Sequence, residues 1–211
     1  MKYALIVILL GLATHSYGQE SVSKLPVYGS VSVGYGNTFF SGILSEKEER
    51  NDQRGFGRND GITLATFYYW APEKLRGLGI GTGVRAFVAR PKNGSNQETY
   101  TYNYYHIGIS IRDYFITKRF NDGLYVTANI GWGQGTEKYS FGNTNTREFQ
   151  NALGITVLGG LGYSIPLNGN HNALNLDLSY EYSNRNAEIT GNTDTVDFIN
   201  SQISFNVGFT F

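Results

Sequence analysis

The chain has 211 residues, enough for one domain with a sizeable core, and carries 17 basic and 17 acidic residues. Zero net charge gives no basic field for nucleic acid, and the absence of cysteine excludes disulfides, thiolate metal ligands, a thiol nucleophile and a lipoprotein anchor. Charged residues make up only 16%, against about 25% in ordinary soluble domains. The 27 glycines disfavour a helical bundle, and 16 Tyr, 13 Phe and 2 Trp exclude disorder.

The first 18 residues have the features of a secretory signal peptide. Lys2 supplies a positive end, residues 3–13 are apolar apart from Gly11, and a short polar stretch of small residues ends at Gly18. The apolar run is about half of the roughly 20 residues that a transmembrane helix needs. We therefore expect cleavage after Gly18, an exported mature chain that forms one domain over 19–211, and no membrane helix.

From residue 27 to the C-terminus, apolar and polar residues alternate in eight runs. The last run is the clearest, because every odd-numbered position from Ile203 to Phe211 is apolar and the positions between them are polar or small. The other seven runs cover 27–35, 62–70, 78–88, 105–111, 124–132, 153–163 and 174–182. Alternation of this kind predicts strands with one apolar and one polar face, and the runs are long enough for tilted strands that cross a membrane.

The connections between the runs alternate in character. Longer, polar or charged connections cover 45–60, 91–98, 140–148 and 184–197, whereas compact turns cover 71–74, 117–123 and 166–172. In an antiparallel barrel, alternate connections fall at opposite ends, with long loops outside the cell and short turns in the periplasm. The sequence therefore predicts an all-β protein, an eight-stranded antiparallel up-and-down transmembrane β-barrel.

Two observations favour this barrel over a soluble lipocalin-like carrier with an apolar lumen. The polar faces hold Ser, Thr, Asn, Gln and Gly rather than the Lys and Glu that coat a water-facing sheet, and small polar groups suit the narrow interior of eight strands. Aromatic residues of the apolar faces gather at the strand ends, as in the two aromatic belts of a bilayer protein. The periplasmic belt is predicted to contain Tyr68, Trp70, Phe115, Tyr163, Phe209 and Phe211, and the outer belt Tyr35, Trp132, Tyr180 and Tyr182.

The signal peptide, the eight runs and the terminal pattern of Ile203, Phe205, Val207, Phe209 and Phe211 resemble the small outer-membrane β-barrel proteins of the OmpA/OmpX type. The amino-acid composition, rich in Tyr, Asn and Gly, is also similar to that of small barrels of Bacteroidota. The resemblance implies that the chain lies in the outer membrane of a Gram-negative bacterium, surrounded by outer-membrane lipid. It also implies that periplasmic chaperones and the barrel-assembly machinery insert the chain, and that the machinery reads the last strand. We expect no appended peptidoglycan-binding domain.

Few charged residues fall on inward-facing strand positions. They are Arg85, Arg112, Asp177 and Glu181, with His106 beside them. Because unpaired charges inside the barrel are costly and these two cations and two anions cancel, we interpret the set as a structural ion-pair network that plugs the lumen. A selective ion path or an active site is the alternative.

No catalytic, cofactor or metal site can be assembled from the sequence. His106 is the one plausible base for an enzyme acting on lipid, but Ser110, on the same face, is roughly 13 Å away along the strand, and no acid is placed beside His106. His171 falls in a periplasmic turn and is expected to be solvated. Asn192, Asp194 and Asp197 lack the Gly and closing Glu of a calcium loop, and the glycines at 131, 133 and 135 open no helix that could bind a nucleotide.

These features favour a non-enzymatic barrel whose extracellular loops act in adhesion, assembly or envelope integrity. The charged connection 45–60 is interpreted as a solvated loop, with a docking surface for another protein as the alternative. A barrel enzyme acting on lipid A or phospholipid remains the alternative function. A narrow pore is disfavoured, because side chains fill the interior of eight strands.

Overall fold

The computed structural model describes residues 26–41, 59–90, 92–93, 98–141, 144–167, 171–189 and 195–211. The expected signal peptide, most of the charged connection 45–60, and Asn192 and Asp194 lie outside these residues. The domain boundary at Gly18 therefore stays a prediction.

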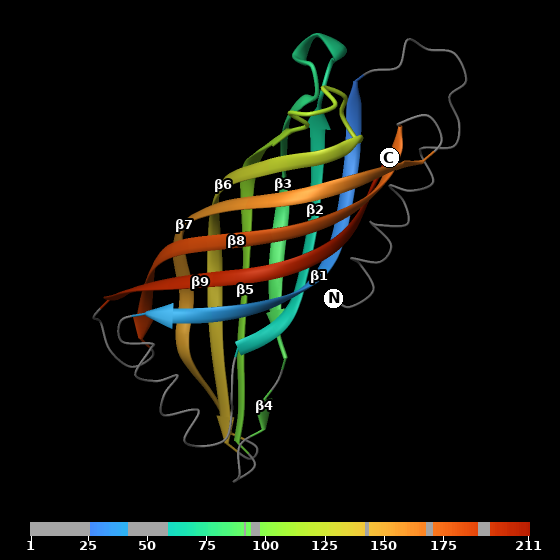
Figure 1. Ribbon diagram of the computed structural model, residues 1–211. Coiled ribbons are helices and arrows are strands. Elements are labelled where there is room, and N and C mark those ends of the chain that lie inside the picture. The colour runs from blue at the N-terminus through green and yellow to red at the C-terminus, as the bar shows by residue number, and fades with distance from the viewer. Residues whose placement is uncertain are drawn as a thin grey trace.

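Eight long strands and one two-residue strand form a closed antiparallel sheet (Figure 1). The long strands are β1 (Val27–Ser41), β2 (Asn59–Trp70), β3 (Leu78–Ala89), β5 (Glu98–Asp113), β6 (Gly123–Phe141), β7 (Thr144–Leu167), β8 (Asn172–Ile189) and β9 (Thr195–Thr210), and the short one is β4 (Lys92–Asn93). Strand β3 pairs with β5, and β1 pairs with both β2 and β9, which closes the barrel. The predicted eight-stranded up-and-down barrel is confirmed.

Two short connections at the predicted periplasmic end use left-handed backbone. Between β2 and β3, the 3-10 helix η2 (Glu73–Leu75) is followed by Arg76 at φ 49° and Gly77 at φ 91°. Between β5 and β6, Lys118 and Asn121 have φ values of 58° and 66°. Residues at positive φ let the chain reverse direction within a few residues, which keeps this end of the barrel compact.

At the opposite end, the hairpins extend further than the sequence predicts. The predicted connections 140–148 and 184–197 are largely strand, because β6 continues to Phe141, β7 begins at Thr144 and β8 continues to Ile189. Strands β5, β6 and β7 reach far beyond the rest of the barrel (Figure 1), and the register between β6 and β7 shifts after Gly135. Outside the bilayer a strand does not need an apolar face. Hydrogen-bonded pairing between these strands therefore continues beyond the point where apolar and polar residues stop alternating.

The outer surface of the barrel is apolar and its interior is polar. On β8, the side chains from Leu174 to Tyr182 on one parity are exposed, whereas those from Asn175 to Ser183 on the other are buried. A water-soluble barrel has the opposite arrangement, so the outer face meets hydrocarbon and the lipocalin-like alternative fails. Most of the exposed aromatic residues lie toward the two ends of this apolar band, at Tyr68, Trp70, Phe115, Tyr163 and Phe209 and at Tyr35, Tyr105, Trp132, Tyr180 and Tyr182; Phe39 and Phe205 are exposed as well. No helix among the described residues is long and apolar enough to cross a membrane.

Aromatic side chains inside the barrel were not expected from the predominantly small polar inward faces. They form two layers, one of Tyr69, Tyr114, Phe120 and Tyr125 with Ala71 toward the periplasm, and one of Phe40, Phe87, Tyr102, Tyr104 and Phe198 with three alanines toward the outside. Glycines on neighbouring strands make room for these rings. A Cβ at Gly81 would lie 2.7 Å from the Tyr69 ring, and one at Gly61 would lie 2.8 Å from the Phe87 ring. These glycines therefore leave space for the aromatic rings that fill the lumen.

Candidate functional site: the barrel lumen

The middle of the lumen contains an ion pair between opposite walls. Arg85 on β3 donates from Nε to Oε2 of Glu181 on β8 over 3.0 Å, and from Nη2 to the Ser204 hydroxyl on β9 over 2.7 Å. Both charged side chains are almost fully buried. Tyr104 donates to Gln202 Oε1 over 2.8 Å beside this pair. Strands β3, β5, β8 and β9 are thus tied together across the centre of the barrel.

His106 lies opposite Arg85 on the neighbouring strand, and it has an acid beside it. Its Nδ1 is 3.9 Å from Oε1 of Glu181, and the imidazole is fully buried. The expectation that no acid lies beside His106 is wrong, because barrel closure brings β8 across the lumen from β5. Inward-facing glycines provide the space for the ring, since a Cβ at Gly131 would lie 2.8 Å from His106 Cδ2 and one at Gly133 would lie 2.6 Å from His106 Cβ.

Toward the periplasm, Arg112 is held by aromatic faces rather than by a carboxylate. The centre of its guanidinium lies 4.9 Å from the Tyr69 ring and 4.6 Å from the Tyr125 ring. The Tyr125 hydroxyl donates to Asp177. Within the described part of the chain Arg112 and Asp177 form no ion pair, so the five predicted residues divide into two groups at different heights. Stacking between two rings stabilises a buried guanidinium through cation–π attraction.

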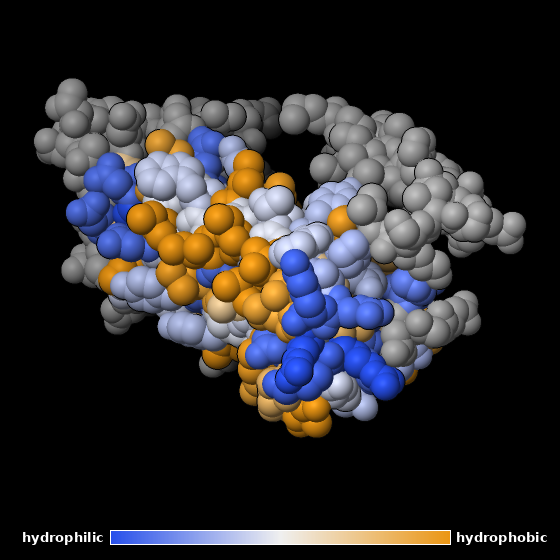
Figure 2. Space-filling view, turned by 90° about the horizontal axis from the view of Figure 1, so that it is seen from above, coloured by the Kyte–Doolittle hydropathy of each residue, from blue (hydrophilic) through white to orange (hydrophobic). Residues whose placement is uncertain are grey.

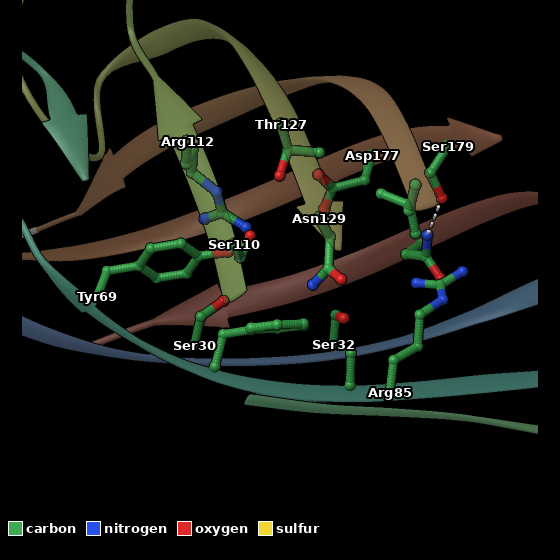
Figure 3. Close-up of a pocket in the computed structure, with 14 residues that line it drawn as sticks. Ser30, Ser32, Tyr69, Arg85, Ser110, Arg112, Thr127, Asn129, Asp177 and Ser179 are labelled. Atoms are coloured by element: carbon green, nitrogen blue, oxygen red, sulfur yellow. Dashed lines mark hydrogen bonds between the residues drawn. The ribbon is translucent and has the colours of Figure 1, made fainter. Parts of the chain in front are cut away.

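A small polar cavity separates the two groups. Its volume is about 40 Å³, that of a few water molecules, and Ser30, Ser110, Asn129 and Ser179 line it together with Arg85, Arg112 and Asp177. In Figure 3 Arg112 and Arg85 approach this space from opposite ends, with Asn129 between them. The periplasmic aromatic layer lies on one side of the cavity and the Arg85–Glu181 pair lies on the other.

A third buried charged group lies nearer the outside and was missed by sequence reasoning. Arg185 on β8 is 1% exposed, donates from Nε to Asn200 Oδ1 over 2.9 Å, and stacks 4.9 Å from the Tyr104 ring. Glu137 on β6 is 2% exposed. Arg185 follows Glu181 by four residues and shares its parity, which is the signal that could have identified it. It was missed because the predicted strand ended at residue 182.

Among the described residues, the lumen contains three buried arginines and three buried carboxylates. Ser110 Oγ is 2.9 Å from the Tyr69 hydroxyl, so this serine is not paired with His106 as a nucleophile. No group of three potential metal ligands occurs among the described residues. His171, expected to be solvated, is exposed, and its ring stacks 6.4 Å from that of Tyr28.

The C-terminal strand presents its apolar residues outward. Ile203, Phe205, Val207 and Phe209 are exposed on the lipid face, and Phe211 stacks 6.1 Å from Phe209. The Phe211 ring also covers Gly29 of β1, where a Cβ would lie 2.7 Å from the ring. Recognition of this strand by the assembly machinery stays a prediction.

A closed eight-stranded barrel with an apolar outer band and a polar, filled lumen has the architecture of a small outer-membrane β-barrel protein. No protein-family model matches the chain, and no characterised protein matches its sequence. The solved structures most informative here are those of Gram-negative outer-membrane proteins.

One is Ail, the attachment invasion locus protein of Yersinia pestis in complex with the heparin analogue sucrose octasulfate, which has a TM-score of 0.54 and 18% identity over 88% of this chain and 99% of that chain. Neisserial surface protein A has a TM-score of 0.50 and 15% identity over 87% of this chain and 96% of that chain. The outer membrane protease OmpT of Escherichia coli has a TM-score of only 0.43 and 9% identity over 91% of this chain and 99% of that chain. Likeness at these identities shows the fold alone, and that fold is the OmpA/OmpX-type barrel that the sequence resembles.

Proposed function

We propose that this protein is a non-enzymatic outer-membrane barrel with a closed lumen, which acts through its extracellular connections and hairpin extensions in adhesion, assembly or envelope integrity. The observation that carries the proposal is the filled lumen. Two aromatic layers enclose the Arg85–Glu181 pair and the cavity of about 40 Å³, so transport through the centre is disfavoured. A barrel closed in this way is left with its outer surfaces for function.

The length of the strands at the outer end supports the same proposal. Strands β6 and β7 have 19 and 24 residues, against 12 each for β2 and β3, and tilted strands need only about 9–11 residues to cross the bilayer. The excess extends the sheet outside the membrane, where a partner could pair with it or bind to it. Ail, which has a similar fold, is named as an attachment protein, which favours adhesion among the three roles.

Enzymatic action on lipid is less well supported. His106 has a nearby carboxylate on Glu181, as an acid–base pair requires, but the imidazole is 0% exposed and faces neither lipid nor the outer rim. If the protein were a lipid A or phospholipid hydrolase, His106→Ala would abolish turnover in outer-membrane vesicles. We expect the purified wild-type protein and this variant to be equally inactive.

The proposal is tested by replacing residues 45–58 with a short Gly/Ser linker, with replacement of residues 168–170 in the predicted periplasmic turn 166–172 as the control. We expect the loop variant alone to lose adhesion to host or abiotic surfaces, or to make the envelope sensitive to detergent, while heat-modifiable gel migration shows that both variants fold. Planar-bilayer recordings of the wild type should show no steady conductance. A steady conductance, or loop and turn variants with identical phenotypes, would contradict the proposal.

A further inference from the structure

Two neighbouring turns at the predicted periplasmic end carry four exposed basic side chains. Lys74 and Arg76 belong to the β2–β3 connection, and Lys118 and Arg119 belong to the β5–β6 connection. We call these four residues the basic rim. Figure 2, which looks onto this end of the barrel, shows strongly hydrophilic residues gathered directly beside hydrophobic ones.

Backbone contacts hold the two turns together. The Tyr114 amide donates to the Gly77 carbonyl oxygen over 3.2 Å. A Cβ at Gly77 would lie 2.9 Å from the Lys118 carbonyl carbon and 3.0 Å from the Arg119 nitrogen. Residues 118 and 119 therefore pack against the residue that directly follows Arg76, and the four basic side chains extend from one connected surface.

The basic rim adjoins the end of the lipid-facing band. Lys74 Nζ lies 5.9 Å from the centre of the Trp70 ring, and Trp70 is 46% exposed on the outer face. On the other turn, Phe115 and Ile116 are exposed and are separated from Lys118 by Thr117 alone. Interfacial Trp and Phe side chains lie at the level of the lipid headgroups, so the Lys74 ammonium is held at that level on the lipid side.

The cations of the basic rim are available for an external anion. The carboxylates nearby are Glu73, Asp122 and the half-buried Asp113. None of them forms an ion pair with Lys74, Arg76, Lys118 or Arg119 in the part of the chain that the structure describes. The four cations exceed the three carboxylates by one charge, and all four basic side chains are exposed.

We propose that the basic rim binds the phosphate groups of anionic phospholipids in the periplasmic leaflet of the outer membrane. Lys and Arg donate charge-assisted hydrogen bonds to phosphate, and a cluster of them beside a bilayer attracts anionic lipid. Trp70, Phe115 and Ile116 would contact the acyl chains below the same headgroups. The rim thus fixes the height of the barrel and enriches anionic lipid around one side of it, where β2, β3, β5 and β6 end.

The test measures lipid retained by the folded, full mature chain. The protein is purified in mild detergent, and native mass spectrometry counts phosphatidylglycerol and phosphatidylethanolamine bound at equal added concentrations. The test variant is K74Q/R76Q/K118Q/R119Q, and the matched control K47Q/R50Q/R54Q/R58Q removes four positive charges from the outer connection. Heat-modifiable migration verifies that each variant folds. We expect the preference for phosphatidylglycerol to fall about tenfold in the rim variant and to persist in the control.

Four results would overturn the proposal. One is an unchanged preference in the rim variant, and another is an equal loss in the outer-connection control, which would indicate net charge rather than this surface. The third is full displacement of phosphatidylglycerol by millimolar glycerol 3-phosphate, which would indicate a site for free phosphate. If purified peptidoglycan rather than lipid binds in a rim-dependent manner, the surface has a different occupant and the proposal fails. None of these outcomes bears on the function proposed for the outer loops.

Discussion

Arg85 and Glu181 are separated by 96 residues in the chain and form a direct ion pair inside the barrel, with Nε and Oε2 3.0 Å apart. Strands β3 and β8 are not neighbours in the sheet, so this contact crosses the lumen. The pair therefore depends on closure of the barrel, which makes it a sensitive reporter of the folded state.

Removal of one partner of this pair should be strongly destabilising. Glu181→Gln leaves a buried Arg85 without its carboxylate, and we expect the free energy of unfolding to fall by about 3–5 kcal/mol. Urea unfolding from lipid vesicles, followed by tryptophan fluorescence, measures the change. Arg90→Gln, at an exposed position just after β3, should have little effect. Arg85→Met/Glu181→Leu should be more stable than either single variant, and a double variant as unstable as the singles would contradict this account.

Arg112 should not be replaceable by lysine. Its planar guanidinium lies between the rings of Tyr69 and Tyr125, and an ammonium cannot stack on two faces in this way. We expect Arg112→Lys to lower the free energy of unfolding by about 1–2 kcal/mol although the charge is kept. The same urea titration measures the change, and a lysine variant as stable as the wild type would show that charge alone matters here.

Two glycines on neighbouring strands should respond oppositely to alanine. At Gly133 a Cβ would overlap the Tyr105 carbonyl oxygen and lie 2.6 Å from His106 Cβ, whereas at Gly159 it would meet nothing within 4 Å. We expect Gly133→Ala to cost about 1–3 kcal/mol and Gly159→Ala to be neutral or slightly stabilising. Refolding yield into vesicles and urea midpoints compare the two variants. Equal losses in both would show that backbone freedom, not the close approach of Tyr105 and His106 on β5, explains Gly133.

An arginine on the lipid face should be tolerated according to its depth. Ile109 is 58% exposed and lies between the two aromatic belts on β5, whereas Ile116 is 64% exposed in the β5–β6 turn. We expect Ile109→Arg to lower the free energy of unfolding in vesicles by about 2–4 kcal/mol and Ile116→Arg to lower it by about 0–1 kcal/mol. If both substitutions cost the same, the apolar band is not the part of the surface in hydrocarbon.

Phe211 should matter more for assembly in cells than for the stability of the finished barrel. The terminal position matches the signal that the resemblance implies for the assembly machinery, and in the barrel its ring covers Gly29 near the start of β1 and stacks on Phe209. We expect Phe211→Ala to reduce the folded fraction in the outer membrane several-fold while purified protein still refolds into vesicles. Phe39→Ala, which removes an equally apolar exposed ring from β1, is the control. Equal amounts of folded wild type and Phe211→Ala in the outer membrane would contradict a role of Phe211 in assembly.

Alternation with period two was sufficient to predict the barrel, its lipid face and much of the charged lumen. The side chain of each strand residue points to one of two faces, so parity alone placed Arg85, Arg112, Asp177 and Glu181 inside. Parity failed where strands leave the bilayer, because no apolar face is required there. For that reason the ends of β6 and β8, with Glu137 and Arg185, were not predicted to be strand.

By itself, the order of residues determined the number of strands, the face that each residue occupies and the environment that each face meets, because these properties follow from local geometry and hydrophobicity. Only the tertiary structure decided which inward groups meet. The Glu181 carboxylate beside His106, the rings around Arg112 and the separation of Arg112 from Asp177 all depend on the curvature and register of a closed sheet. Those are long-range properties, since strands nearly a hundred residues apart contact each other only after the barrel has closed.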